Sequence, residues 1–184
     1  MPPAARGKIV VKAPAKKKPV KDAPGGKRSA ARLAAVQALY QLDISGGRIP
    51  DVIREFIEHR IGRELDGDQY GGADIELFKT LVEGVWKGRE EMDNLIAAVL
   101  PEAWPLERLE SILRQILRCG VYELADQVQV PAPVAISEYV GVTDAFYSGK
   151  EPGMVNAVLD RLARDLRPSE AKTREAKKEA KKGA

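Results

Sequence analysis

Few residues in this 184-residue chain are of a type that could catalyse a reaction or hold a metal ion. The chain contains one cysteine, Cys119, and one histidine, His59. A single histidine excludes a site with several histidine ligands, and a single cysteine excludes a disulfide framework. Cys119 lies in an apolar stretch, which predicts a buried small hydrophobe, and His59 lies between two charged residues on a predicted solvated helix face. These residues favour a binding protein over an enzyme.

Two short motifs resemble ion-binding or phosphate-binding loops but lack essential residues. An EF-hand loop beginning at Asp66 needs an oxygen ligand at its fifth position and a glutamate at its twelfth, where this sequence has Tyr70 and Leu77. Gly149-Lys150 matches the end of a phosphate-binding loop, but Asp144 stands where the leading glycine belongs, and no strand is expected before it. We therefore expect no metal and no cofactor.

Charge is unevenly distributed along the chain, whose formal net charge is +3. Residues 1–28 carry nine Lys/Arg against one Asp, residues 29–166 have a net charge of −9, and residues 167–184 have a net charge of +4. An acidic body with two basic arms favours a polyanionic partner, although basic tails also serve only to keep proteins in solution. No apolar run is long enough to cross a bilayer and no secretory signal is present, so we expect a cytoplasmic protein without membrane contact.

The apolar residues recur with helical spacing, which predicts an all-α fold of about six or seven helices. Inward-facing residues of the first helix are expected to include Val36, Leu39 and Tyr40, and those of later helices to include Ile75 and Phe146. Gly120, in the most strongly periodic helix, predicts a close helix crossing, because glycine there costs about 1 kcal/mol relative to alanine. The first helix is expected at about 30–42, with a cap at Ser29 and an end signal at Ser45-Gly46-Gly47. Further helices are expected from Pro50, from a cap at Asp74 to Pro101, after Pro105, at 134–147 and at 153–165.

Composition divides the chain into three parts. Residues 1–27 are expected to be a disordered basic arm, because five prolines interrupt any helix and little apolar surface offsets the cost of ordering. Residues 28–166 form the predicted helical domain, within which the Gly/Asp-rich residues 62–73 are typical of a loop. Residues 167–184, rich in Lys, Ala and Glu, are expected to be a second basic tail without an apolar stripe for docking.

Four blocks of the sequence follow one another in the order of a known family. They are Arg32-Leu-Ala-Ala-Val-Gln-Ala-Leu-Tyr40, Leu117-Arg-Cys-Gly-Val-Tyr-Glu-Leu124, Pro133-Val-Ala-Ile-Ser-Glu138 and Met154-Val-Asn-Ala-Val-Leu-Asp160. Together they cover about residues 27–166 and resemble the NusB family of transcription antitermination factors. The resemblance implies two small helical bundles packed as one domain. It further implies binding of boxA-type single-stranded RNA together with ribosomal protein NusE, and indirect support of read-through by RNA polymerase in ribosomal RNA operons.

The resemblance also implies residues that contact RNA. The family's site begins with an Arg-rich run at the start of the first helix, where this sequence has Lys27, Arg28 and Arg32. Arg28 and Arg32 are about 40° apart around a helix, so both can face one partner. Alternatively, the aliphatic part of the Arg32 side chain packs against the edge of the core. The start of the last helix contributes Met154, where relatives often have an aromatic residue, and Lys150 precedes it. The RNA-binding candidates are therefore Lys27, Arg28, Arg32, Gln37, Lys150 and Met154.

Two other functions stay open at this point. One is a protein–protein adaptor whose tails only keep it in solution, and the other is an accessory factor in rRNA maturation without direct sequence-specific RNA binding. A similar helical module occurs at the N-terminus of some rRNA cytosine methyltransferases, but the short tail after Leu166 leads us to expect no catalytic domain. The sequence leaves open the preferred RNA sequence and the oligomeric state, including a homodimer.

Overall fold

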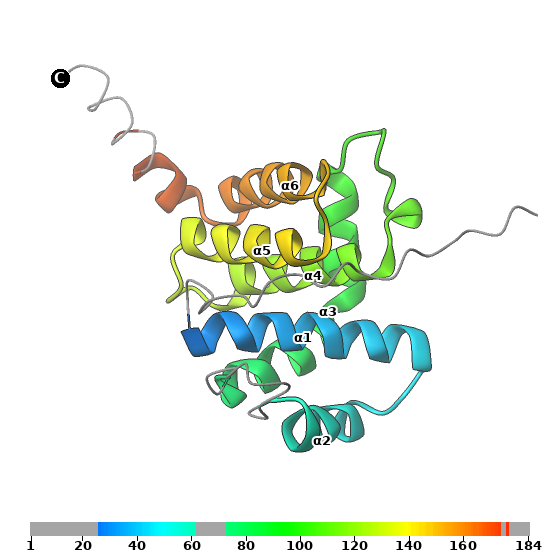
Figure 1. The fold of residues 1–184 in the computed structure, drawn as a ribbon. Helices are drawn as coiled ribbons and strands as arrows, with labels where there is room; N and C mark the ends of the chain where they lie inside the picture. The colour runs from blue at the N-terminus through cyan, green and yellow to red at the C-terminus, as the bar shows by residue number, and fades with distance from the viewer. Residues whose placement is uncertain (1–25, 62–72, 174–175, 177–184) are drawn as a thin grey trace, which may run out of the picture.

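The computed structural model describes residues 26–61, 73–173 and 176. All regular secondary structure within these residues is helical, as predicted (Figure 1). The predicted N-terminal arm, most of the loop at 62–73 and the end of the C-terminal tail lie outside them. No helix in the described part is long and apolar enough to span a bilayer. The elements are α1 (Gly26–Ser45), α2 (Ile49–His59), α3 (Ile75–Val99), the 3-10 helix η1 (Leu106–Arg108), α4 (Ser111–Asp126), α5 (Ala132–Phe146) and α6 (Glu151–Leu166).

Helix α4 lies at the centre of the molecule and packs against α1, α3, α5 and α6. This position explains why its sequence is apolar on more than one side. Helices α1, α2 and α3 form one small bundle and α4, α5 and α6 form the other, so the predicted pair of bundles shares one core. In Figure 1, α1 and α5 lie one above the other and start on the same side of the molecule.

Three helix ends follow signals of the sequence, whereas α1 begins at Gly26, three residues before the expected cap at Ser29. The carboxylate of Asp74 accepts a hydrogen bond from the backbone N–H of Leu77 at 3.0 Å and thereby caps α3, as predicted. Helix α1 ends at Ser45, and the φ of the following Gly46, 65°, is the left-handed conformation that glycine adopts without strain. Helix α3 ends before Pro101, since the residue preceding a proline is disfavoured in helical conformation.

Three apolar residues that the helical spacing places in the core are exposed instead. Tyr40 is 41% exposed, Ile75 38% and Phe146 37%. Ile75 and Phe146 are the first residue of α3 and the last residue of α5, so each lies at a helix end. Tyr40 lies at the edge of the apolar stripe of α1, and its side chain faces a groove described below. The prediction that Tyr40 belongs to the core is therefore wrong.

Arg167, counted above with the basic tail, belongs to the packed body. Its guanidinium donates hydrogen bonds to the backbone carbonyls of four residues at the end of α4 and in the connector to α5, at 2.5 to 3.1 Å. The last carbonyls of an α-helix have no partner within the helix, and here one buried arginine provides it. Glu170 in turn accepts a hydrogen bond from the backbone N–H of Ala132 at 2.9 Å, and this contact lowers the pKa of Glu170. The acceptors of Arg167 are the carbonyls of Glu123, Leu124, Gln127 and Val130.

Gly120 marks the predicted close helix crossing, between α4 and α6. A Cβ added at Gly120 would lie 2.7 Å from Leu159 Cδ1, and Leu159 is completely buried. We expect Gly120→Ala to lower the free energy of unfolding by about 1–3 kcal/mol, because overpacking outweighs the better helix propensity of alanine. Chemical denaturation of the variant measures this difference.

The matched control is Gly141→Ala in α5, where an added Cβ meets nothing within 4 Å. At this position only the higher helix propensity of alanine acts, and the free energy of unfolding should rise by up to about 1 kcal/mol. Equal effects of the two substitutions would contradict the close crossing.

Candidate nucleic-acid interface

Lys27 and Arg28 lie in the first turn of α1, and both side chains are exposed. Arg28 Nε is 3.7 Å from Asp74 Oδ2, and 55% of the Arg28 side chain remains exposed. The backbone carbonyl of Lys27 accepts a hydrogen bond from the N–H of Asp74 at 2.9 Å, which ties the start of α1 to the start of α3. Both cations can therefore reach a phosphate from solvent.

Arg32, one turn further along α1, is buried in an ion pair. Its Nε and Nη2 donate to Glu123 Oε2 and Oε1 at 2.7 and 2.8 Å, a two-point contact between α1 and α4. Glu138 Oε2 of α5 lies 3.2 Å from Arg32 Nη1 and also accepts from the Ser29 hydroxyl. The Tyr139 hydroxyl donates a further hydrogen bond to Glu123. Three helices thus meet at one buried guanidinium.

This arrangement corrects the assignment of Arg32 to the RNA-contacting group. Arg32 is 2% exposed and Glu123 is completely buried, so a phosphate in solvent has no access to this guanidinium. Burial alone lowers the pKa of Arg32, but the hydrogen bond and charge of Glu123 outweigh it and raise that pKa above its ordinary value. Burial and the neighbouring Glu123 raise the pKa of Tyr139 as well. Arg32 stays charged and fixed.

The remaining candidates lie apart from Lys27 and Arg28. Lys150 is exposed in the turn between α5 and α6, which Figure 1 shows on the side opposite to the start of α1. Met154 is 8% exposed and packs in the core, so it offers little surface for contact with a base. Gln37 is half-buried on α1. A ligand that touches both Arg28 and Lys150 must therefore extend along α1.

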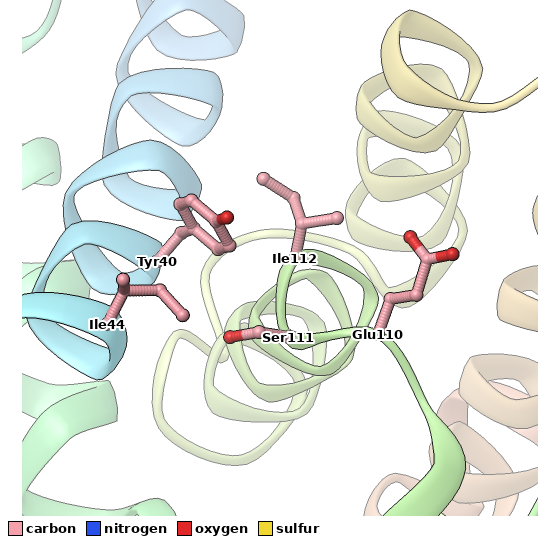
Figure 2. Close-up of a pocket in the computed structure, with 5 residues that line it drawn as sticks. All are labelled: Tyr40, Ile44, Glu110, Ser111 and Ile112. Atoms are coloured by element: carbon pink, nitrogen blue, oxygen red, sulfur yellow. The ribbon is translucent and has the colours of Figure 1, made fainter. Parts of the chain in front are cut away.

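A shallow groove lies at the other end of α1. Figure 2 shows Tyr40 and Ile44 of α1 facing Ser111 and Ile112 at the start of α4, with Glu110 on the far rim. Ile44 is 66% exposed. The groove therefore combines apolar walls with a carboxylate at its edge.

Hydrogen bonds hold the rim of this groove in place. The Tyr147 hydroxyl donates to Glu110 Oε2 at 2.9 Å, and burial together with Glu110 raises the pKa of Tyr147. The Ser111 hydroxyl donates to Asp43 Oδ2, which adds a second carboxylate near the groove. The carboxylates are thus part of a fixed, negatively charged edge.

Cys119 and His59 lie where the sequence predicts them, in the core and on the surface. Cys119 is completely buried, and burial raises the pKa of its thiol, as expected for a small core residue. His59 is exposed at the end of α2. Among the described residues, no group of three or more His, Cys, Asp or Glu side chains is placed to hold a metal ion.

Neither the groove nor the partners of Arg32 were predicted from the sequence. A signal for the partners of Arg32 was present, since Glu123 falls on the apolar stripe of α4, seven residues after Ile116. A carboxylate at a buried helix position requires a cation, and α1 supplies one with Arg32. The groove gave no such signal, because the same apolar residues suit a core equally well.

In the part of the chain that the structure describes, the fold is all-helical, with exposed cations at the start of the first helix and a groove at its end. The chain belongs to the NusB family, whose model matches residues 29–164.

Individual relatives agree with this assignment. The chain is 47% identical over 145 residues to the transcription antitermination protein NusB of Sinorhizobium medicae, an overlap of 79% of this chain and 91% of that protein. The solved structure of T. maritima NusB superposes with a TM-score of 0.63 at 25% identity, covering 79% of this chain and 96% of that one. A solved complex of the antitermination factors NusB and NusE with dsRNA contains a chain that superposes with a TM-score of 0.60 at 25% identity, covering 74% and 96%.

The buried ion pair makes a stability prediction that separates Arg32 from Arg28. Arg32→Met should lower the free energy of unfolding by about 3–5 kcal/mol, because Glu123 would be left buried without its cation. Arg28→Met should change it by less than about 1 kcal/mol, since Arg28 takes part only in an exposed pair. Denaturant titration of both variants provides the comparison. Similar losses for the two variants would show that the Arg32 pair does not support the fold.

Proposed function

We propose that this protein is a transcription antitermination factor that binds boxA-type single-stranded RNA together with ribosomal protein NusE. It would support read-through by RNA polymerase in ribosomal RNA operons, act in the cytoplasm and work by binding rather than catalysis. The observation that carries the proposal is the pair of exposed cations, Lys27 and Arg28, at the start of α1. The basic residues 1–25 precede them directly, and membership of the NusB family supports the same conclusion.

The RNA contact would begin with phosphates. Lysine and arginine that pair with phosphates release condensed counterions, so binding by this route is fast and sensitive to salt. Unstacked bases then supply specificity through hydrogen bonds at their edges. From Arg28 to Gln37, α1 is about 14 Å long, which gives an extended strand a path along this helix that stops short of the groove.

The protein partner would occupy the groove at the end of α1. Tyr40, Ile44 and Ile112 offer apolar contact, and the carboxylates of Asp43 and Glu110 complement a basic ribosomal protein. This location leaves the start of α1 free for RNA. The solved complex of a related NusB with NusE and dsRNA supports a joint assembly of protein and nucleic acid.

RNA binding can be tested by its dependence on salt. If three to five phosphates are neutralised, the slope of log K against log salt for a short boxA-type RNA should be about −2 to −3.5. Arg28→Ala should reduce the magnitude of this slope by about 0.7, the contribution of one phosphate on a single strand. Fluorescence anisotropy of the full chain with labelled RNA measures both slopes.

The control for this experiment is Arg54→Ala, which removes an exposed arginine on α2. It should leave the slope unchanged. A slope near zero in the full chain, or equal effects of the two substitutions, would contradict phosphate binding at the start of α1. Deleting residues 1–25 tests the alternative function as a protein–protein adaptor whose tails only keep it in solution. If that alternative holds, the deletion should not reduce the amount of RNA retained.

The groove makes a separate prediction about the protein partner. Ile44→Glu places a charge on an exposed apolar wall and should weaken binding of NusE by about tenfold, equivalent to about 1.4 kcal/mol. Val128→Glu is the control, because Val128 is 70% exposed on the connector between α4 and α5. Calorimetric titration with purified NusE compares the two, and equal affinities would move the partner to another surface.

A further inference from the structure

Hydrogen bonds to main-chain groups hold the Asp74 carboxylate close to the exposed start of α1, independently of the side chains of Lys27 and Arg28. Its backbone N–H donates to the Lys27 carbonyl at 2.9 Å, and its Oδ1 accepts from the Leu77 N–H at 3.0 Å. The other oxygen, Oδ2, is left 3.7 Å from Arg28 Nε. The position of this negative charge is therefore set by the main chain at the starts of α1 and α3.

Carboxylates lie next to the arginines at the start of α1 and offset their positive charge. Arg32 is committed to Glu123 and Glu138, and Asp74 faces Arg28. Arg28 nevertheless stays 55% exposed, so a phosphate can approach it from solvent while Asp74 stays close by. Two arginines and three carboxylates thus form this cluster, namely Arg28 and Arg32 with Asp74, Glu123 and Glu138.

We propose that Asp74 is an attenuating residue of the RNA site, which lowers the affinity of the start of α1 for phosphates irrespective of base sequence. The inference rests on the proposed function. A phosphate paired with Arg28 is repelled by the neighbouring carboxylate, so the attraction of this cluster for RNA in general is reduced. Such a repulsive element limits binding to unrelated polyanions, while contacts to the bases retain the intended ligand.

Asp74→Asn tests this role without removing the helix cap, because asparagine caps a helix about as well as aspartate does. With the full chain in about 50 mM salt, the substitution should tighten binding of a boxA-type RNA about twofold, as expected for one like charge removed at roughly 7 Å in water with partial screening. An RNA of the same length and scrambled sequence should gain as much. The gain should shrink toward zero as salt rises to about 0.5 M, because screening shortens the range of the repulsion.

Asp51→Asn is the matched control. It removes a carboxylate that also pairs with an arginine, Arg54 at 2.9 Å, but lies in the first turn of α2, beyond the far end of α1. It changes the net charge equally and should not change the affinity. If thermal melting shows that Asp74→Asn does not fold, Asp74→Ser keeps a capping oxygen and removes the same charge.

The RNA affinities of the wild type and of the two variants have three possible outcomes. Tighter binding of both RNAs by the Asp74 variant alone supports the attenuating role. Unchanged or weaker binding by that variant overturns it, and leaves Asp74 as a helix cap or as an orienting partner of Arg28. Failure of the wild-type chain to bind any RNA at low salt overturns the proposed function and this inference with it.

Discussion

The buried contact between Arg32 and Glu123 joins the two bundles and determines how α1 lies on the rest of the molecule. An unpaired charge at this depth would be strongly unfavourable, so α1 must present Arg32 to α4 at a defined position and rotation. Tyr139 and Glu138 of α5 complete the contact, which fixes α5 beside α1. Because a helix is rigid over this length, fixing one turn also determines which side chains of α1 face solvent.

The two contact surfaces follow from that constraint. One turn before Arg32, Arg28 faces outward, and about two and three turns after it Tyr40 and Ile44 face the groove beside α4. A single helix thus presents cations at one end and an apolar surface with an acidic rim at the other. This separation suits a protein that brings a nucleic acid and a basic protein together, since neither ligand must displace the other.

Most of the fold could be predicted from local signals in the sequence. Apolar spacing, the Asp74 cap and the glycines after Ser45 fixed the helices to within a few residues, and Gly120 indicated the crossing with α6. The site was less predictable, because the role of an arginine depends on carboxylates far away in the chain. Arg32 and Glu123 are 91 residues apart, so helical periodicity alone cannot pair them. For the same reason Arg167 was counted with the tail, although it holds the end of α4.

The different roles of Arg28 and Arg32 can be measured directly on the folded protein. An NMR titration with a short boxA-type RNA, recorded on the arginine Nε–Hε signals, reports Arg28 and Arg32 separately. The Arg28 signal should move as RNA is added, while the Arg32 signal should stay in place and exchange slowly with solvent. Movement of the Arg32 signal with an unchanged Arg28 signal would contradict the separate roles of the two arginines.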